Sequence, residues 1–214
     1  MKLKALLVAG AVCLASAVNS SAAEVFSANT VGFVNKTIPT GFSMIANPVV
    51  AADNSIAALF GSVAVNNMQV FKFSANEGGF ASFSYFFGWS TGADTTTLVP
   101  GEGAFIYNPG DPVTVTFTGE VVQGVNSNMQ IGQGFSIVSS TVAQGGLLQT
   151  DLKFPVENND QVFLWDAGSQ QYDPRSYFFG WSGGEPSVGV ADAFFVNKAN
   201  ASNWDRNFDP NAGS

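Results

Sequence analysis

Short runs of alternating apolar and polar residues dominate the chain and predict β-strands. Val113, Val115 and Phe117 alternate with threonines, a period of two that places the apolar side chains on one face of a strand. Segments such as 41–47 (GFSMIAN) and 69–73 (QVFKF) are rich in strand-forming residues and are bounded by Gly, Pro, Asn or Asp nearby. This pattern predicts an all-β protein built from short strands joined by turns.

One segment favours a helix instead. Residues 53–61 (DNSIAALFG) offer Asp53 or Asn54 as the N-cap and Gly61 as the terminating residue. We expect the later segment 145–152 (GGLLQTDL) to form one turn at the corresponding place.

Self-comparison of the chain indicates a tandem duplication. The heptapeptide SYFFGWS occurs at 84–90 and again at 176–182, an offset of 92. Three further pairs of segments match in the same order, at offsets of 92, 93 and 89: 69–73 with 161–165, 41–49 with 134–142, and 99–108 with 188–197. These colinear matches predict two copies of a unit of about 90 residues, each with about five or six strands. Two copies suit a pseudo-twofold body better than a long solenoid.

The start of the chain has the layout of a secretory signal peptide. Lys2 and Lys4 precede an apolar run, and Ser21, Ala22 and Ala23 form a small-residue cleavage site. We therefore expect residues 1–23 to be removed on export, and the protein to be periplasmic, at the cell surface or extracellular.

The predicted organisation follows from the leader and the duplication. The boundaries are a signal peptide at 1–23, a first β unit at 24–123, a bridge at 124–133 and a second β unit at 134–214. We expect antiparallel β-sandwich or barrel-like units related by a pseudo-twofold axis.

The charge composition argues against two classes of binding partner. The chain carries 16 acidic and 8 basic residues, and loss of Lys2 and Lys4 with the leader brings the net charge from −8 to −10. Such a surface repels nucleic-acid phosphates and anionic lipids, so we expect neither nucleic-acid binding nor membrane insertion. The single cysteine, Cys13, lies in the leader, so the 20 phenylalanines rather than disulfides must supply the stability.

The motifs also carry a resemblance to a protein family. The opening SANTVGFVNKTIPTGFSMIANP, the central LVPGEGAFIYNPG, the TVTFTGEVVQG strand and the second GFSIVSS stand in this order along nearly the whole mature chain. This combination resembles a group of exported, uncharacterised β-proteins of environmental bacteria. The resemblance implies export and an all-β fold, and brings no activity or catalytic residues with it.

The residue types argue against catalysis. The chain has no histidine, which removes the usual base of nucleophilic enzymes and the common zinc, copper and iron ligand sets. Carboxylate chemistry is left, with these candidates: Glu102, Asp111, Glu120, Asp160, Glu185 and Asp192. At an offset of 89, however, Glu102 falls opposite Ala191 and Asp192 opposite Gly103, so the two units share no acid there. We predict no enzyme and no catalytic residues.

Two acidic segments raise the question of calcium. Residues 157–160 (ENND) and 205–209 (DRNFD) cluster oxygen ligands, but neither has the spacing of an established calcium loop. Ordinary Asx turns explain both better, and we expect no cofactor and no metal site.

The repeated heptapeptide offers the candidate ligand site. On a regular strand its aromatic side chains would share one face, which favours packing in the core over exposure to a ligand. Gly88 and Gly180 introduce an alternative, because a glycine bulge would turn Trp89 and Trp181 to the other face. The candidate ligand-binding residues are Trp89, Trp181, Tyr85, Tyr177, Ser90 and Ser182.

Three functions fit these features. The first hypothesis is a non-catalytic exported structural or cell-surface protein that associates with itself or with surface components. The alternative is a carbohydrate-binding β module that stacks sugar rings on exposed Trp and Tyr. A lesser alternative is an outer-membrane β-barrel, against which the strands are short and the chain ends in DPNAGS.

Overall fold

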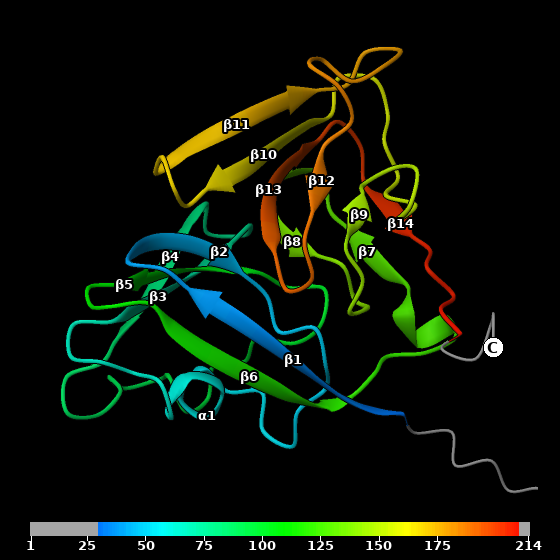
Figure 1. Cartoon of the computed structure of the whole chain (residues 1–214). Coiled ribbons are helices and arrows are strands. Elements are labelled where there is room, and N and C mark those ends of the chain that lie inside the picture. The colour runs from blue at the N-terminus through cyan, green and yellow to red at the C-terminus, as the bar shows by residue number, and fades with distance from the viewer. Residues whose placement is uncertain (1–29, 210–214) are drawn as a thin grey trace, which may run out of the picture.

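A computed structural model describes residues 30–209, and within them strands make up nearly all the regular structure (Figure 1). The predicted signal peptide lies outside these residues. The first half contains β1 (Val31–Ile38), β2 (Gly41–Ile45), α1 (Ile56–Phe60), β3 (Gln69–Ser74), β4 (Gly79–Ser84), β5 (Ala104–Asn108) and β6 (Val113–Glu120). The second half contains η1 (Val125–Ser127), β7 (Met129–Ile131), β8 (Gly134–Ser139), β9 (Gly146–Leu147), β10 (Gln161–Asp166), β11 (Gln171–Ser176), β12 (Ser187–Val188), β13 (Ala193–Lys198) and β14 (Ser202–Trp204). The predicted all-β class is confirmed.

The strands form two four-stranded antiparallel sheets and three two-stranded ones. The strand orders of the larger sheets are β2-β5-β3-β4 and β8-β13-β10-β11, and β1 pairs with β6, β7 with β14 and β9 with β12. Both larger sheets are open, with two edge strands each, so the architecture is sandwich-like rather than barrel-like. The segments that match in sequence have the same strand order, which is what a duplication would produce. The expected bridge contains η1 and β7, and β7 pairs within the second half.

The strand pairings change one detail of the sequence alignment. Val70 pairs with Ile106 in the first sheet, and Val162 pairs with Val196 in the second. These pairs set the offset of the last matching segment at 90 rather than 89. The alignment based on matching residues in these short segments was therefore shifted by one residue. The strand pairings, and not residue identities, define which positions correspond.

Alternation along the strands of the larger sheets gives each strand two apolar faces. In β5, Ile106 belongs to the core of the first half, while Phe105 points to a layer between the sheets. In β13, Phe194 belongs to the core of the second half, while Phe195 packs against that layer. The inner strands β5 and β13 are therefore covered on both faces, which explains their apolar residues at successive positions.

Three apolar clusters follow from this arrangement. The first lies between the sheet β2-β5-β3-β4 and the β1-β6 ribbon with α1, and the second surrounds Trp204 in the other half. The third joins the two larger sheets face to face (Figure 1) and includes Met44, Phe105, Ile137 and Ala193. We call this third cluster the aromatic layer, because Phe71, Phe73, Trp165 and Phe195 pack against it.

The expected helix at 53–61 is confirmed, but its cap is different. The Ser55 hydroxyl accepts a hydrogen bond from the Ala58 backbone N–H at 3.2 Å, so Ser55 is the N-cap. Asp53 instead accepts from the Ser55 N–H at 2.8 Å, and this bond lowers the pKa of the exposed Asp53 carboxyl below its ordinary value.

The described part of the chain contains no helix with the length and apolarity needed to cross a bilayer.

Reciprocal backbone contacts tie the two halves together beside the aromatic layer. The Ala46 N–H donates to the Ala191 carbonyl at 3.0 Å, and the Ser139 N–H donates to the Gly101 carbonyl at 3.0 Å. Gly103 lies at this junction, where an added Cβ would come within 2.4 Å of the Ala193 Cβ. The close approach of the two sheets therefore requires glycine at this position.

We predict that Gly103→Ala lowers the free energy of unfolding by about 1–3 kcal/mol, because the added methyl overpacks the junction. Gly132 is the matched control, since nothing lies within 4 Å of a Cβ there, and Gly132→Ala should change stability by less than about 1 kcal/mol. Urea unfolding measures both. Equal effects of the two substitutions would contradict the face-to-face packing.

A fully buried ion pair anchors the end of β13. Lys198 and Asp160 have no exposed side-chain surface, and the Lys198 ammonium donates to the Asp160 carboxylate. Asp160 also accepts from the backbone N–H of Ala199 at 2.8 Å and of Glu157 at 2.9 Å. The carboxylate is thus satisfied by a lysine and two amides, and it fixes the loop before β10 to the end of β13.

Removing the lysine alone should be costly. We predict that Lys198→Met lowers the free energy of unfolding by about 3–5 kcal/mol, because it leaves a buried carboxylate without its counter-ion. Adding Asp160→Asn should recover part of that loss. The control is Lys36→Met, which removes the partly exposed Lys36–Asp192 pair and should cost at most about 1 kcal/mol. A small effect of Lys198→Met in urea unfolding would show that the pair is hydrated.

Candidate functional site

The repeated heptapeptide forms a tight turn rather than a continuing strand. β4 ends at Ser84, and the chain then reverses so that Tyr85 and Trp89 form an antiparallel bridge. The Phe86 N–H donates to the Gly88 carbonyl at 2.9 Å, which closes the turn. The prediction that the heptapeptide is a regular strand is therefore wrong for every residue after Ser84.

The second copy repeats this geometry. β11 ends at Ser176, Tyr177 bridges to Trp181, and the Phe178 N–H donates to the Gly180 carbonyl at 2.9 Å. We call the segments 85–89 and 177–181 the two Phe–Phe turns.

The indoles predicted to bind a ligand are half-buried and face the cores. Trp89 packs against the first core with Tyr85 beside it, their ring centroids 5.5 Å apart. Trp181 packs against the second core with Tyr177 at 5.3 Å, and its Nε1–H donates to the Gln149 side-chain oxygen at 3.2 Å. A tryptophan and a tyrosine thus lie together in each turn, on the inner side.

The two predicted serines have structural partners. The Ser90 hydroxyl accepts from the Ser84 N–H at 3.1 Å, and the Ser182 hydroxyl accepts from the Ser176 N–H at 2.8 Å. Both serines close the base of their turn. Their hydroxyls support the turn geometry, as a serine beside a chain reversal commonly does.

The outer side of each turn is a pair of exposed phenylalanine rings. Phe86 and Phe87 are 65% and 81% exposed, and Phe178 and Phe179 have the same two values. The ring centroids of each pair are 4.8 Å apart, at an interplanar angle of 74°. Sequence reasoning missed these four residues because it assigned them to a strand, although the exact repetition of the heptapeptide was a usable signal.

The exposed rings come with backbone strain. Phe87 and Phe179 both have φ of 55°, in the left-handed region that large side chains avoid at about 1–2 kcal/mol per residue. The backbone therefore kinks at Phe87 and Phe179, and not at Gly88 and Gly180, where a bulge was expected. Asn66 holds the strained Phe87 by accepting from its N–H at 2.9 Å, and Asn158 holds Phe179 at 2.8 Å. The strain at these two phenylalanines is thus not offset by burial of their rings.

An open hollow between the two larger sheets is the second candidate feature. It has a volume of about 540 Å³, which is in the range of ligand sites, and we call it the aromatic groove. Its lining residues are Phe42, Phe71, Phe80, Ser82, Phe105, Trp165 and Tyr172. Its accessible rings lie on three edge strands: Phe80 of β4 is 48% exposed, Tyr172 of β11 is 43% exposed and Phe42 of β2 is 37% exposed.

The floor of the groove is fixed by ring contacts and hydrogen bonds. The Phe105 ring lies at 5.2 Å from Trp165, nearly perpendicular to it. The Trp165 Nε1–H donates to the Phe42 carbonyl at 2.8 Å, and the Gln170 side chain pairs with both the N–H and the carbonyl of Phe42. The polar tip of the indole is therefore occupied, and the groove presents ring faces.

Electrostatics agree with an apolar site. No lining residue of the groove is charged, and burial raises the pKa of the Tyr172 phenol above its ordinary value of 10.0. The aromatic surface continues into a smaller hollow of about 270 Å³ lined by Phe135, Phe163, Tyr172 and Phe195.

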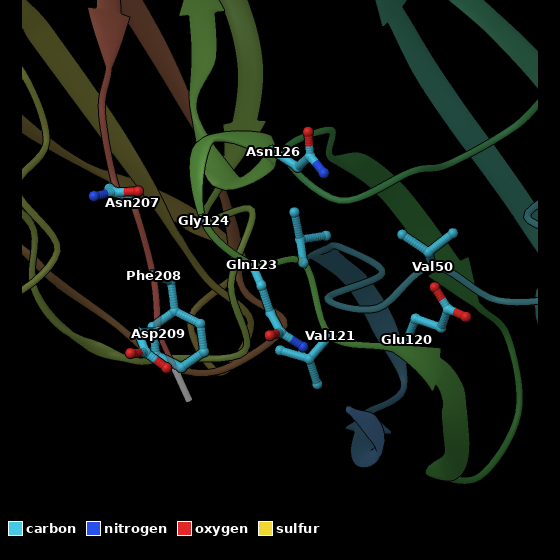
Figure 2. Close-up of a pocket in the computed structure, with 10 residues that line it drawn as sticks. Val50, Glu120, Val121, Gln123, Gly124, Asn126, Asn207, Phe208 and Asp209 are labelled. Atoms are coloured by element: carbon cyan, nitrogen blue, oxygen red, sulfur yellow. The ribbon is translucent and has the colours of Figure 1, made fainter. Parts of the chain in front are cut away.

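A different cavity, of about 650 Å³, lies where the chain leaves β6 (Figure 2). The segment 120–126 lines one side and the segment 207–209 the other, joined by a hydrogen bond from the Gly124 N–H to the Phe208 carbonyl at 2.7 Å. Its lining mixes valines, amides, Phe208 and two carboxylates, Glu120 and Asp209. Among the residues that the structure describes, no group of three or more His, Cys, Asp or Glu could hold a metal ion, here or elsewhere.

Three of the six carboxylates considered for catalysis serve as caps of turns or loops. Glu102 accepts from the Val99 N–H at 2.9 Å and Asp192 accepts from the Gly189 N–H at 2.7 Å, each three residues earlier. Each is also paired with a lysine, Lys72 or Lys36. With the offset of 90 the two acids correspond, so the expectation that the halves share no acid here is wrong. Glu185 likewise caps a loop, through the Gln149 and Thr150 amides.

Comparison of the chain with protein-family models, with curated proteins and with solved structures finds no match. The geometry of the Phe–Phe turns and of the aromatic groove is therefore the basis for inferring a function.

We predict that Phe87→Gly leaves the free energy of unfolding unchanged or raises it by about 1 kcal/mol, because glycine adopts a positive φ without strain. Phe179→Gly should behave in the same way. The control is Phe83→Ala at the buried end of β4, which should cost about 3–5 kcal/mol. If Phe87→Gly destabilised the protein by more than 1 kcal/mol in urea unfolding, the ring would have a role in folding after all.

Proposed function

We propose that the protein is a non-catalytic, exported structural protein that associates with itself through exposed aromatic surface. The observation that carries this proposal is the pair of identical Phe–Phe turns, whose rings are exposed and held in a strained backbone. Exposed apolar groups of this kind mark interaction sites on soluble proteins. The two turns follow different edge strands, β4 and β11, so one molecule has two such contacts to offer.

The charge of the chain supports association by apolar contact. The mature chain carries a net charge of −10 once Lys2 and Lys4 are removed, so two copies repel each other at long range. Neither the Phe–Phe turns nor the aromatic groove contains a charged residue. These surfaces are where two copies can approach with least repulsion.

Carbohydrate binding is the second candidate, and the aromatic groove favours it more than the predicted tryptophans do. Trp165 and Tyr172 offer ring faces to a sugar, whereas Trp89 and Trp181 are packed on the cores. Sugar recognition also needs hydrogen-bond partners for hydroxyls, and the lining supplies Ser82 and the Tyr172 hydroxyl. Glycan titration followed by Trp fluorescence, with Tyr172→Ala as the variant, tests this candidate.

We predict that the mature wild-type protein shows an average mass that rises with concentration, because the exposed rings bury surface on association. Replacement of Phe86, Phe87, Phe178 and Phe179 by Ser should give a monomer at all concentrations. Phe33→Ser is the matched control, since Phe33 is 72% exposed but lies on β1, outside the turns. Sedimentation equilibrium measures the mass. Added salt should strengthen the association by screening the net negative charge.

A monomeric wild-type protein at the highest attainable concentration would contradict the proposal. An equal effect of Phe33→Ser and of the fourfold variant would show that general apolarity, and not the Phe–Phe turns, causes the association.

A further inference from the structure

We propose that the aromatic groove of one molecule receives a Phe–Phe turn of a second copy. This inference rests on the proposed self-association and names its contact. The turn is the protruding apolar group and the groove is its receptor, and the same chain carries both.

The two features match in chemistry. A Phe–Phe turn presents two uncharged rings, and the groove presents the edges and faces of six aromatic rings in a hollow of about 540 Å³. Perpendicular ring pairs already line the groove, as between Phe105 and Trp165, and such pairs add about 0.5–1.5 kcal/mol beyond the area buried. The groove offers few polar partners, so an aromatic segment suits it better than a polar ligand does.

The two features are not in contact within one molecule, because none of the four phenylalanines of the turns lines the groove. Phe80 lines the groove near the start of β4, and the first turn begins after Ser84 at the end of that strand. The groove lining reaches along β4 as far as Ser82, yet the Phe86 and Phe87 rings contact each other and stay 65% and 81% exposed. Tyr172 and the second turn stand in the same relation along β11. The exposed rings of a turn are therefore free to enter the groove of another molecule.

The contact is heterologous, because different surfaces of the two copies meet. Such contacts leave a free groove on one molecule and free turns on the other, and so continue into chains or rings. This geometry agrees with a structural protein that assembles outside the cell.

Each single contact is expected to be weak. One phenylalanine buries about 150–250 Å², so a turn and its groove together bury roughly 600–1,000 Å², below the range of stable interfaces. We therefore expect dissociation constants in the micromolar range or weaker for one contact, with repeated contacts holding an assembly together.

Disulfide trapping suits a weak contact in this protein, because the only cysteine, Cys13, lies in the predicted leader. Ser82→Cys places a thiol in the groove wall, and Gly88→Cys or Gly180→Cys places one at a turn, where a Cβ meets nothing within 4 Å. Ala81→Cys is the control, because Ala81 is exposed on the same strand but points to the opposite face.

Mixtures of the purified single-cysteine proteins are oxidised and the crosslinked dimers are quantified. We expect the Ser82→Cys protein to crosslink to the Gly88→Cys or Gly180→Cys protein at least several-fold more than the Ala81→Cys protein does. Introducing Ser at both phenylalanines of the turn that carries the cysteine should abolish this excess. Comparing the two turn positions identifies which turn occupies the groove.

Two results would overturn the groove contact while leaving self-association in place. One is crosslinking between two turn cysteines in preference to turn and groove, and the other is no excess over Ala81→Cys although the wild-type mass still rises with concentration. A wild-type protein that stays monomeric would instead overturn the proposed function itself.

Discussion

The aromatic layer between the two four-stranded sheets is the interaction on which the rest of the structure depends. The inner strands β5 and β13 turn one face to the core of their own half and the other to this layer, as Ile106 and Phe105 do in β5. Because these inner strands are apolar on both faces, each sheet needs the other to cover the side that it turns away from its own core. The two halves therefore complete each other, and the reciprocal hydrogen bonds of Ala46 and Ser139 fix their spacing.

The layer is incomplete at its rim, and this is what creates a site. Phe105 and Ala193 are buried in it, but Phe80 and Tyr172 on the edge strands are nearly half exposed. A protein selected only for stability would cover such rings or replace them by polar residues. Burying a phenylalanine fully contributes about 1.5–3 kcal/mol to the free energy of unfolding, and the four exposed rings of the Phe–Phe turns lack most of this contribution. Phe87 and Phe179 also add backbone strain. Against a typical total stability of about 5–15 kcal/mol, this cost needs a functional reason.

The sequence predicts much of the fold and little of the site. Alternation at 113–118 and the repeated motifs predict the strands correctly, because a period of two and turn residues are local signals. The Ser55 cap is a local contact, but Asp53 and Asn54 are equally good capping types, so the sequence does not single it out. The offset of 90 and the buried Lys198–Asp160 pair depend on contacts between residues distant in the sequence, which local patterns do not specify. The aromatic groove is of the same kind, since its seven lining residues come from six different strands.

The heptapeptide shows where local rules mislead. A run of Tyr, Phe, Phe and Trp has high strand propensity, yet the chain reverses at Phe87 with a positive φ that propensity disfavours. The reversal turns Tyr85 and Trp89 inward and the two phenylalanines outward, which is the opposite of the predicted ligand face. Departures of this kind from local rules are expected at functional sites.

Intermolecular paramagnetic relaxation tests the central claim most directly, because it detects weak contacts without trapping them. Unlabelled protein with a spin label on Gly88→Cys or Gly180→Cys is mixed with isotopically labelled wild-type protein of the same chain. The account predicts that signals of Phe80, Tyr172 and the Trp165 indole N–H broaden, and that those of Phe33 do not. Broadening confined to the Phe–Phe turns of the labelled protein, or uniform broadening over its surface, would contradict it.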